Sequence, residues 1–190
     1  MSALSVLAEE ASGCTRCPLA DGRTQVVFGM GNPNADLMFV GEGPGAEEDL
    51  QGLPFVGRSG RLLDRLILEE MGLTRADFYV TNAVKCRPPG NRDPRPEEIA
   101  ACRPYLERQL DLIEPTVVVT LGNFASKLLL ATNLGITRLR GHSYPYRRGV
   151  LIPTVHPSYV LRGGTGAMAQ LRADLVRAKL ALVEPAWLAP

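Results

Sequence analysis

The segment LMFVGEGPGAEED, from Leu37 to Asp49, joins an apolar run to a glycine-rich turn. Leu37–Val40 is apolar at every position, which is typical of a strand that is buried on both faces of a sheet. Gly41, Gly43 and Gly45 follow within five residues, and glycines at this place allow the backbone to approach a ligand closely. A phosphate is a common ligand of such a turn, but the carboxylates that come next would repel one. The segment therefore predicts a buried strand that ends at a binding site, and it leaves the ligand open.

Three more apolar runs resemble Leu37–Val40, and segments with helical periodicity separate them. The further strands are expected at Phe78–Val80, Thr116–Thr120 and Val150–Thr154. The helices are expected at Gly60–Met71, which ends at the good C-cap Gly72, and at Pro96–Ile113, Asn123–Ala131 and Met168–Val183. Strands that alternate with helices predict an α/β sandwich with a parallel sheet, and Val26–Phe28 is a candidate for a small edge strand.

The length of 190 residues fits one domain over residues 1–190 with a substantial core. No run is long enough to cross a membrane, and Met1–Gly13 lacks the order of a signal peptide, so we expect a cytoplasmic protein. The net charge of +1 conceals an asymmetry, because most charged side chains of residues 1–57 are acidic and most of those of residues 138–190 are basic. An anionic partner on one face and an ordinary solvated surface explain this asymmetry equally well.

A polar or glycine-containing motif follows each of the four predicted strands. These motifs are GEGPG from Gly41, TN ending at Asn82, LG ending at Gly122 and HPS from His156. In an open parallel sheet, ligands bind at the carboxyl ends of the strands. The four motifs, although far apart along the chain, are therefore predicted to converge on one site.

The four cysteines form two pairs, Cys14 with Cys17 and Cys86 with Cys102. A Cys-x-x-Cys pair in a cytoplasmic protein binds metal or does redox chemistry more often than it forms a structural disulfide. A proline follows Cys17, as it follows the last cysteine of some ferredoxin-like cluster sites. Four thiolates without a nearby histidine suit zinc and an iron–sulfur cluster equally, so the spacing leaves the metal open.

Together, GEGPGAEED, LPFVG, TNAVKCRPP, HPSYVLR and the cysteine spacing resemble the family 4 uracil-DNA glycosylases, the iron–sulfur class of that superfamily. The resemblance runs from about Cys14 to Arg162. It implies a three-layer α/β/α sandwich with a central four-stranded parallel sheet, and a [4Fe–4S] cluster held by Cys14, Cys17, Cys86 and Cys102. The cluster is expected to be structural, because hydrolysis of an N-glycosidic bond moves no electrons.

The resemblance also implies a monofunctional enzyme of base excision repair. Such an enzyme flips uracil out of DNA, hydrolyses the N-glycosidic bond and leaves an abasic site without cleaving the strand. Its partner is uracil-containing DNA, single or double stranded, and we expect a monomer. No lysine is a strong candidate for a Schiff base, Lys85 beside Cys86 being the nearest. In this reading the glycine-rich turn approaches the flipped base and its sugar, where carboxylates are acceptable.

By resemblance, the uracil pocket contains Gly41, Glu42, Gly43, Glu48, Phe55, Asn82 and His156. Asn82 donates to uracil O4 and accepts from N3–H, a pattern that cytosine does not match. Phe55 stacks on the ring, and Glu48 lies beside C5, where it excludes the methyl group of thymine. Each also has an ordinary interpretation: a turn asparagine, a core phenylalanine and an acidic residue at a helix N-terminus.

Catalysis is assigned to His156 and Glu42. A neutral His156 donates a hydrogen bond to uracil O2 as the base leaves as an anion. Related glycosylases have a water-orienting aspartate where Gly43 aligns, so Glu42 is expected to hold the water or to stabilise the oxocarbenium-like sugar. Asn91 is a loop residue within possible reach of the site, and His142 is interpreted as a structural or a surface residue.

The segment HPSYVLRGG is expected to enter the DNA. Ser158 contacts a phosphate, and Leu161 or Arg162 fills the gap that the flipped nucleotide leaves; a plain strand-to-helix connection is the alternative. Two other functions stay open: a glycosylase for other deaminated bases such as hypoxanthine, and a non-enzymatic four-cysteine module that binds nucleic acid. Base release from a uracil-containing oligonucleotide distinguishes among them.

Overall fold

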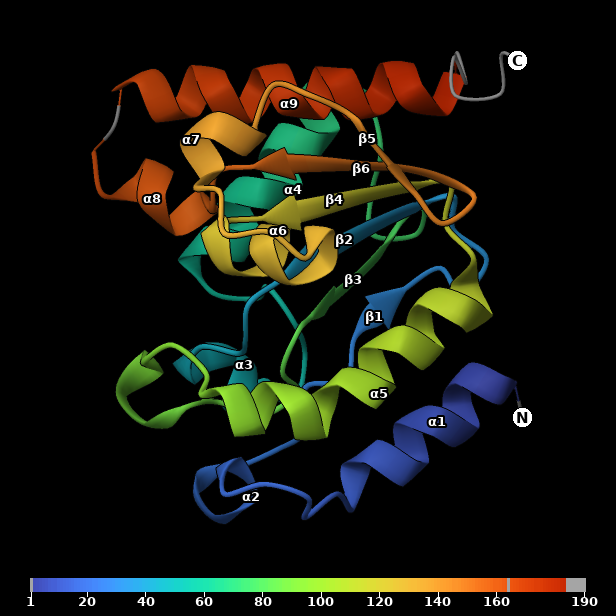
Figure 1. The fold of residues 1–190 in the computed structure, drawn as a ribbon, viewed down its shortest axis with the longest axis vertical. Coiled ribbons are helices and arrows are strands. Elements are labelled where there is room, and N and C mark those ends of the chain that lie inside the picture. Colours follow the sequence, from blue (N-terminus) through green and yellow to red (C-terminus); the bar gives the residue numbers. More distant parts are fainter. Residues whose placement is uncertain (1, 164, 184–190) are drawn as a thin grey trace.

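A six-stranded mixed sheet forms the centre of the molecule (Figure 1). This computed structural model describes residues 2–163 and 165–183, so the predicted domain of residues 1–190 extends beyond the described residues. The sheet has the strand order β1-β3-β2-β4-β6-β5, in which β3, β2, β4 and β6 are parallel and the two edge strands are antiparallel. The strands are β1 (Met30–Gly31), β2 (Leu37–Gly41), β3 (Tyr79–Asn82), β4 (Val117–Leu121), β5 (Tyr144–Tyr146) and β6 (Gly149–Thr154).

The four parallel strands are those that the sequence predicts, but the expected strand count of the sheet was wrong. The sequence does not predict the two edge strands, because neither is an apolar run. β1 has two residues, and Gly31 there has φ 122°, with the carbonyl oxygen of Phe78 2.0 Å from where a Cβ would stand. β5 is a short strand with Pro145 at its centre. Val26–Phe28, the proposed edge strand, is not a strand in the structure.

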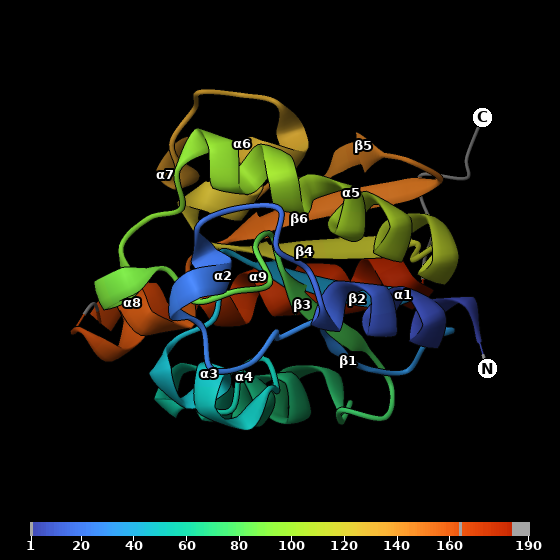
Figure 2. The same cartoon turned by 90° about the horizontal axis from the view of Figure 1, so that it is seen from below.

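Helices cover both faces of the sheet and make three layers (Figure 2). One face packs its alternate side chains, such as Phe39 and Val119, against α4 (Arg58–Met71) and α9 (Thr165–Val183). The other face packs Met38 and Val118 against α5 (Pro96–Ile113) and α6 (Asn123–Leu130). The α/β/α sandwich is thus confirmed, because side chains on a strand point alternately to its two faces.

Shorter helices complete the described chain. They are α1 (Ala3–Ser12), α2 (Leu19–Gly22), α3 (Ala46–Gln51), the 3-10 turn η1 (Pro89–Asn91), α7 (Ile136–Leu139) and α8 (Pro157–Leu161). α1 packs on α5 and, with it, encloses Cys86 and Cys102 in a third apolar cluster. In the residues 2–163 and 165–183, we find no helix with the length and apolar character to cross a membrane.

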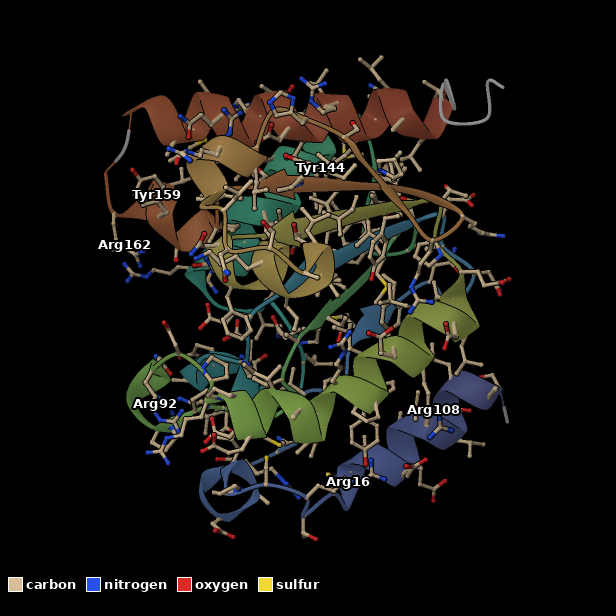
Figure 3. All side chains as sticks on the ribbon, viewed as in Figure 1. Arg16, Arg92, Arg108, Tyr144, Tyr159 and Arg162 are labelled. Atoms are coloured by element: carbon tan, nitrogen blue, oxygen red, sulfur yellow. The ribbon has the colours of Figure 1, made fainter. Side chains whose placement is uncertain are left out.

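The parallel strands end level with one another. Gly41 of β2 pairs with Asn82 of β3, and Leu121 of β4 pairs with Thr154 of β6. Figure 3 shows Tyr159 of α8, Arg162 directly after α8 and Arg92 of the loop before α5 on this same side of the molecule, toward which the arrows of β4 and β6 point. The sheet therefore brings the ends of four strands to one edge.

Candidate active site

A cleft of about 1340 Å³ opens at the carboxyl ends of the parallel strands. The segments that follow β2, β3, β4 and β6 all contribute to its lining, as the sequence predicts. The lining includes the sequence-predicted residues Glu42, Gly43, Glu48, Phe55, Asn82, Asn91, His156, Ser158, Leu161 and Arg162. The remaining candidate, Gly41, lies directly behind this lining.

The Asn82 amide stands at the buried end of the cleft. Its residue is 1 % exposed, and its oxygen Oδ1 has no hydrogen-bond partner among the described residues. A Cβ on Gly41 would lie 2.4 Å from this oxygen and 2.6 Å from Cζ of Phe55, so only glycine leaves both side chains in place. A buried acceptor without a partner is costly, and a ligand that supplies an N–H would satisfy it.

The ring of Phe55 forms an adjacent wall of the cleft. Its centroid lies 6.1 Å from that of the His156 ring, with 33° between the ring planes. The Phe55 backbone has φ 54°, a left-handed conformation that is unusual for a residue with a bulky side chain. Such outliers persist only where the surrounding structure holds them.

The Glu48 carboxylate joins the glycine-rich turn to the Phe55 loop. Its Oε1 accepts hydrogen bonds from the amides of Val56 and Gly57 at 2.9 and 2.8 Å, and its Oε2 accepts one from the amide of Gly45 at 3.1 Å. Glu48 is also the third residue of α3, so the ordinary interpretation as a helix N-terminal acid holds for it. Its place beside uracil C5 stays a prediction.

His156 is the N-cap of α8 as well as part of the cleft lining. Its Nδ1 accepts a hydrogen bond from the amide of Ser158 at 3.1 Å and lies 2.8 Å from Oγ of the same residue. Since an amide can only donate, Nδ1 carries a lone pair, and a neutral ring has its proton on Nε2. Burial, followed by the charge of Arg162, lowers the pKa of His156 to about 4, whereas Glu48 opposes this shift. At neutral pH the ring is therefore an uncharged donor.

Glu42 follows β2 and faces a second carboxylate. Burial, followed by the charge of Asp93 and a hydrogen bond with it, raises the pKa of Glu42 to about 7. Asp93 and Asn91 belong to the loop that Arg92 fastens to Glu98 with two hydrogen bonds of 2.9 and 2.6 Å. Asn91 lines the cleft as expected, and its side-chain oxygen accepts a hydrogen bond from Nε of Arg87 at 2.7 Å. Near neutral pH, Glu42 can both hold and release a proton.

The four cysteines form no disulfide and line one small cavity that is separate from the cleft. The Lys85 amide donates to Sγ of Cys102 at 3.2 Å, and a guanidinium N–H of Arg23 donates to Sγ of Cys86 at 3.6 Å. Burial raises the pKa of Cys86 to about 11, so this thiol is protonated unless a cation binds it. Among the described residues, no three histidine, cysteine or carboxylate side chains converge tightly enough to hold a single metal ion. Thiols around one cavity, with N–H groups directed at their sulfurs, fit a thiolate-bound cluster.

The Lys85 amine is buried between this cavity and Asn82. It donates to Oγ1 of Thr81, to the carbonyl oxygen of Asn82 and to Oε1 of Gln109, at 2.6, 2.7 and 2.5 Å. Lys85 is 2 % exposed and does not line the cleft. This amine is therefore part of the wall behind the site and does not face it.

Known proteins match this chain over a range that includes all the segments of the cleft. The model of the uracil DNA glycosylase superfamily matches residues 28–178. The chain belongs to this superfamily. A type-4 uracil-DNA glycosylase of Thermotoga maritima is 45 % identical over 179 residues, which cover 93 % of each chain. One of Sulfurisphaera tokodaii is 46 % identical over 169 residues, which cover 85 % of this chain and 77 % of the relative. These identities assign the chain to the type-4 branch, as the resemblance indicates.

The superfamily site in this chain also includes residues that sequence reasoning missed. Asp93, in the loop PPGNRDP, was not singled out, although the expectation for nearby Asn91 points to that loop. Behind this site, Arg75 escaped notice because it binds backbone carbonyl groups some twenty residues away, and Asp64 escaped notice because it binds Arg75; no pattern in the sequence marks such contacts. Gly43, which aligns with an aspartate of related glycosylases, has little room: a Cβ there would lie 2.8 Å from a methyl group of Val84.

Proposed function

We propose that this chain is a uracil-DNA glycosylase, which hydrolyses the N-glycosidic bond of uracil in DNA and leaves an abasic site. The type-4 uracil-DNA glycosylases to which it is similar support this function. The observation that carries the proposal is the buried oxygen of Asn82, which lacks a partner among the described residues and lies beside the ring of Phe55.

Uracil fits the chemistry of this end of the cleft. Its N3–H supplies the donor that Asn82 Oδ1 lacks, and its O4 accepts from the Asn82 amide nitrogen. Phe55 stacks on the base, a contact worth about 1–3 kcal/mol per base. Cytosine presents an acceptor at N3 and would leave the Asn82 oxygen without a partner, at a cost of about 1–3 kcal/mol. Glu48 is proposed to lie near C5 and, through its three amide hydrogen bonds, to fix the distance between the two loops.

The chemical step depends on stabilising the leaving base. The bond between C1′ and N1 breaks with its electron pair on N1, and the developing charge reaches O2. The neutral His156 donates from Nε2 to this oxygen, and a preorganised donor of this kind is typically worth about 10²–10³ in rate. The amide of Ser158 keeps Nδ1 unprotonated, so the ring presents its donor to the cleft.

Water completes the hydrolysis by adding to C1′. Glu42 is proposed to orient this water and to accept its proton, or to stabilise the positive charge on the sugar. A pKa of about 7 suits a group that exchanges a proton near neutral pH. The proton lost by water balances the one that the uracil anion takes up when it leaves as the neutral base.

A [4Fe–4S] cluster held by Cys14, Cys17, Cys86 and Cys102 is part of the proposal. Each cysteine of a cubane binds a different iron, so its ligands surround a cavity and need not meet at a point. The cluster would supply cross-links between the N-terminal segment, the end of β3 and α5, and would take no part in bond cleavage. The cavity lined by all four thiols supports this assignment.

We further propose that the chain is one domain that works as a cytoplasmic monomer on single- or double-stranded DNA. Every candidate site residue comes from one chain, so the cleft needs no second copy. Four cysteines that form no disulfide suit a reducing compartment. Ser158, Leu161 and Arg162 on or beside α8 are proposed to contact the DNA, and the side chains of Leu161 and Tyr159 are about half exposed there.

The decisive experiment is uracil release from an oligonucleotide with one deoxyuridine, under single-turnover conditions. Matched oligonucleotides with thymine, cytosine or hypoxanthine at the same position test the selectivity. Hypoxanthine presents the same acceptor and N–H pair as uracil, so pocket size rather than Asn82 must exclude it. We expect alkali-dependent strand breaks only, because the Lys85 amine is enclosed and Lys127, which lines the cleft, is not among the proposed uracil-binding residues. Release of hypoxanthine in preference to uracil would favour the alternative glycosylase, and absence of all base release would favour the binding module.

A further inference from the structure

The loop that carries Phe55 is held from two sides by opposite charges. Arg75, which follows α4, donates from Nη1 to the carbonyl oxygen of Pro54 at 3.1 Å and from Nη2 to that of Phe55 at 2.7 Å. Glu48 accepts from the next two amides, those of Val56 and Gly57. The peptide units on both sides of the Phe55 Cα are therefore fixed by charged side chains.

The Arg75 guanidinium is itself held rigidly. Its Nε and Nη2 donate to the two carboxylate oxygens of Asp64, at 2.6 and 3.1 Å, while its plane lies near the ring of Phe78. Four of its five N–H donors are thus used, two on Asp64 and two on the loop. A planar fork can make these four hydrogen bonds at once, whereas a lysine ammonium has only three donors on a single nitrogen.

The hydrogen bonds from Arg75 hold a residue whose backbone has a positive φ angle. Phe55 has φ 54°, and its carbonyl oxygen is enclosed further by Gly60 of α4, where a Cβ would lie only 1.7 Å away. A loop released from Arg75 would relax toward the ordinary negative φ, which would turn the ring away from Gly41 and His156.

We propose that Arg75, oriented by Asp64, is the positioning residue of the base-stacking Phe55 and keeps its ring in the pocket before uracil arrives. This inference rests on the proposed function, since it concerns how that same pocket is formed. Arg75 does not line the cleft and touches neither base nor sugar in this arrangement. Its effect on the reaction must therefore pass through Phe55.

A double-mutant cycle tests this dependence. Phe55→Ala is expected to lower single-turnover uracil release by about 5- to 150-fold, the range of a lost stacking contact. Arg75→Ala alone is expected to lower it by about 3- to 30-fold, but by less than about twofold when Phe55 is already alanine. Arg75→Lys should behave like Arg75→Ala. Inhibition of the reaction by free uracil should weaken in the same pattern, which a loss of fold stability alone would not produce.

Arg172→Ala is the matched control. Arg172 of α9 also binds carboxylates of α4, those of Glu69 and Glu70, but it does not touch the Phe55 loop. Its replacement should lower the melting temperature and leave the rate and the inhibition by uracil unchanged. All assays are run well below the lowest melting temperature of the set.

Two results would overturn the inference: a wild-type rate for Arg75→Ala, or equal losses in the presence and absence of the Phe55 ring. If Arg75→Ala does not fold, the cycles with Arg75→Lys and Asp64→Asn decide by the same outcomes. A wild-type chain that releases no uracil contradicts the proposed function. If the wild type is active and the losses of rate from the Arg75 and Phe55 substitutions simply add, only the role of Arg75 is contradicted.

Discussion

A Cβ atom on Gly41 would lie 2.4 Å from the side-chain oxygen of Asn82. The same atom would lie 2.6 Å from the ring of Phe55, so Gly41→Ala must displace one or both of these side chains. We expect uracil release to fall by at least about 10²-fold, as when a catalytic group is moved by about 1 Å. Gly166→Ala in α9 is the control, because its Cβ meets open space and alanine stabilises a helix by about 0.5–1 kcal/mol. A fully active Gly41→Ala enzyme would place Asn82 and Phe55 outside the pocket.

His156→Ala should lower single-turnover cleavage by about 10²–10³-fold, the size of a lost oxyanion-type donor. DNA affinity should change little, because contacts to phosphates dominate binding. Rapid-quench assays and fluorescence anisotropy on one oligonucleotide measure the two effects separately. A near-normal rate would refute the assignment of leaving-group stabilisation to this residue.

The lowered pKa of His156 also predicts a loss of stability in acid. Its pKa is about 4 in the folded chain and ordinarily 6.5, so the unfolded chain binds the extra proton between these values. Stability therefore rises with pH through this window and is lost as pH falls from 6.5 toward 4. Urea midpoints of the wild type and His156→Ala at pH 4.5 and 7 should show a smaller pH dependence in the variant.

Glu42 should produce the opposite pH dependence of stability. Its pKa is raised from 4.5 to about 7, so the folded chain holds a proton that the unfolded chain has lost. Stability therefore falls as pH rises between these values, and Glu42→Gln should melt at a higher temperature than the wild type at pH 8 but not at pH 4. If the Glu42 carboxylate serves the reaction, the rate should rise through about pH 7, and Asp93→Asn should move this rise to lower pH. An unchanged profile in Asp93→Asn would exclude this coupling.

The cysteine site predicts a coloured protein. A [4Fe–4S] cluster should give broad absorbance near about 400 nm and about four iron atoms per chain. Cys86→Ala or Cys102→Ala should lower the soluble yield and the iron content together, because these ligands connect β3 and α5. A colourless, active protein with one zinc per chain would contradict the cluster.

The ion pair between the partly buried Arg140 and the buried Asp174 should matter for the fold. Asp174 is 1 % exposed and accepts two hydrogen bonds of 3.0 Å from Arg140 and one of 2.8 Å from Thr154. Asp174→Ala leaves Arg140 uncompensated, so we expect a loss of about 3–5 kcal/mol in the free energy of unfolding. Arg148→Ala, which breaks an exposed pair with Glu114, should cost at most about 1 kcal/mol. Equal losses in the two variants would show that burial does not set the difference.

The four parallel strands could be predicted from the sequence, because a strand buried on both faces of a sheet requires a continuous apolar run. Pro96–Ile113 was predicted with its observed bounds, since a proline and two glutamates mark its start. β1, β5 and α8 were not predicted, because two to five residues carry too little periodicity. Their positions depend on pairing with strands and on the His156 cap, which are tertiary contacts.

The candidate site is readable in part for a similar reason. Glycine, asparagine and histidine directly after buried strands are conspicuous, and parallel pairing brings them together. The side chains that hold the Phe55 loop are not conspicuous, because arginine and glutamate on a surface loop or helix look the same whether or not they bind backbone groups. Only the structure distinguishes Arg75, with four hydrogen bonds, from the other arginines of the chain.

The strand order has a consequence for how activity is lost. Of the strands that neighbour each other at the cleft, only β2 and β3 are consecutive in the chain, and the pocket residues at the strand ends span Gly41 to His156. A contiguous fragment that lacks part of this span therefore lacks some of the pocket residues. If the chain unfolds cooperatively, loss of uracil release in denaturant should coincide with loss of helical circular dichroism. Catalysis would then report on the integrity of the whole sheet, and a chain that is partly unfolded, or cleaved so that part of this span is lost, would carry no residual repair activity.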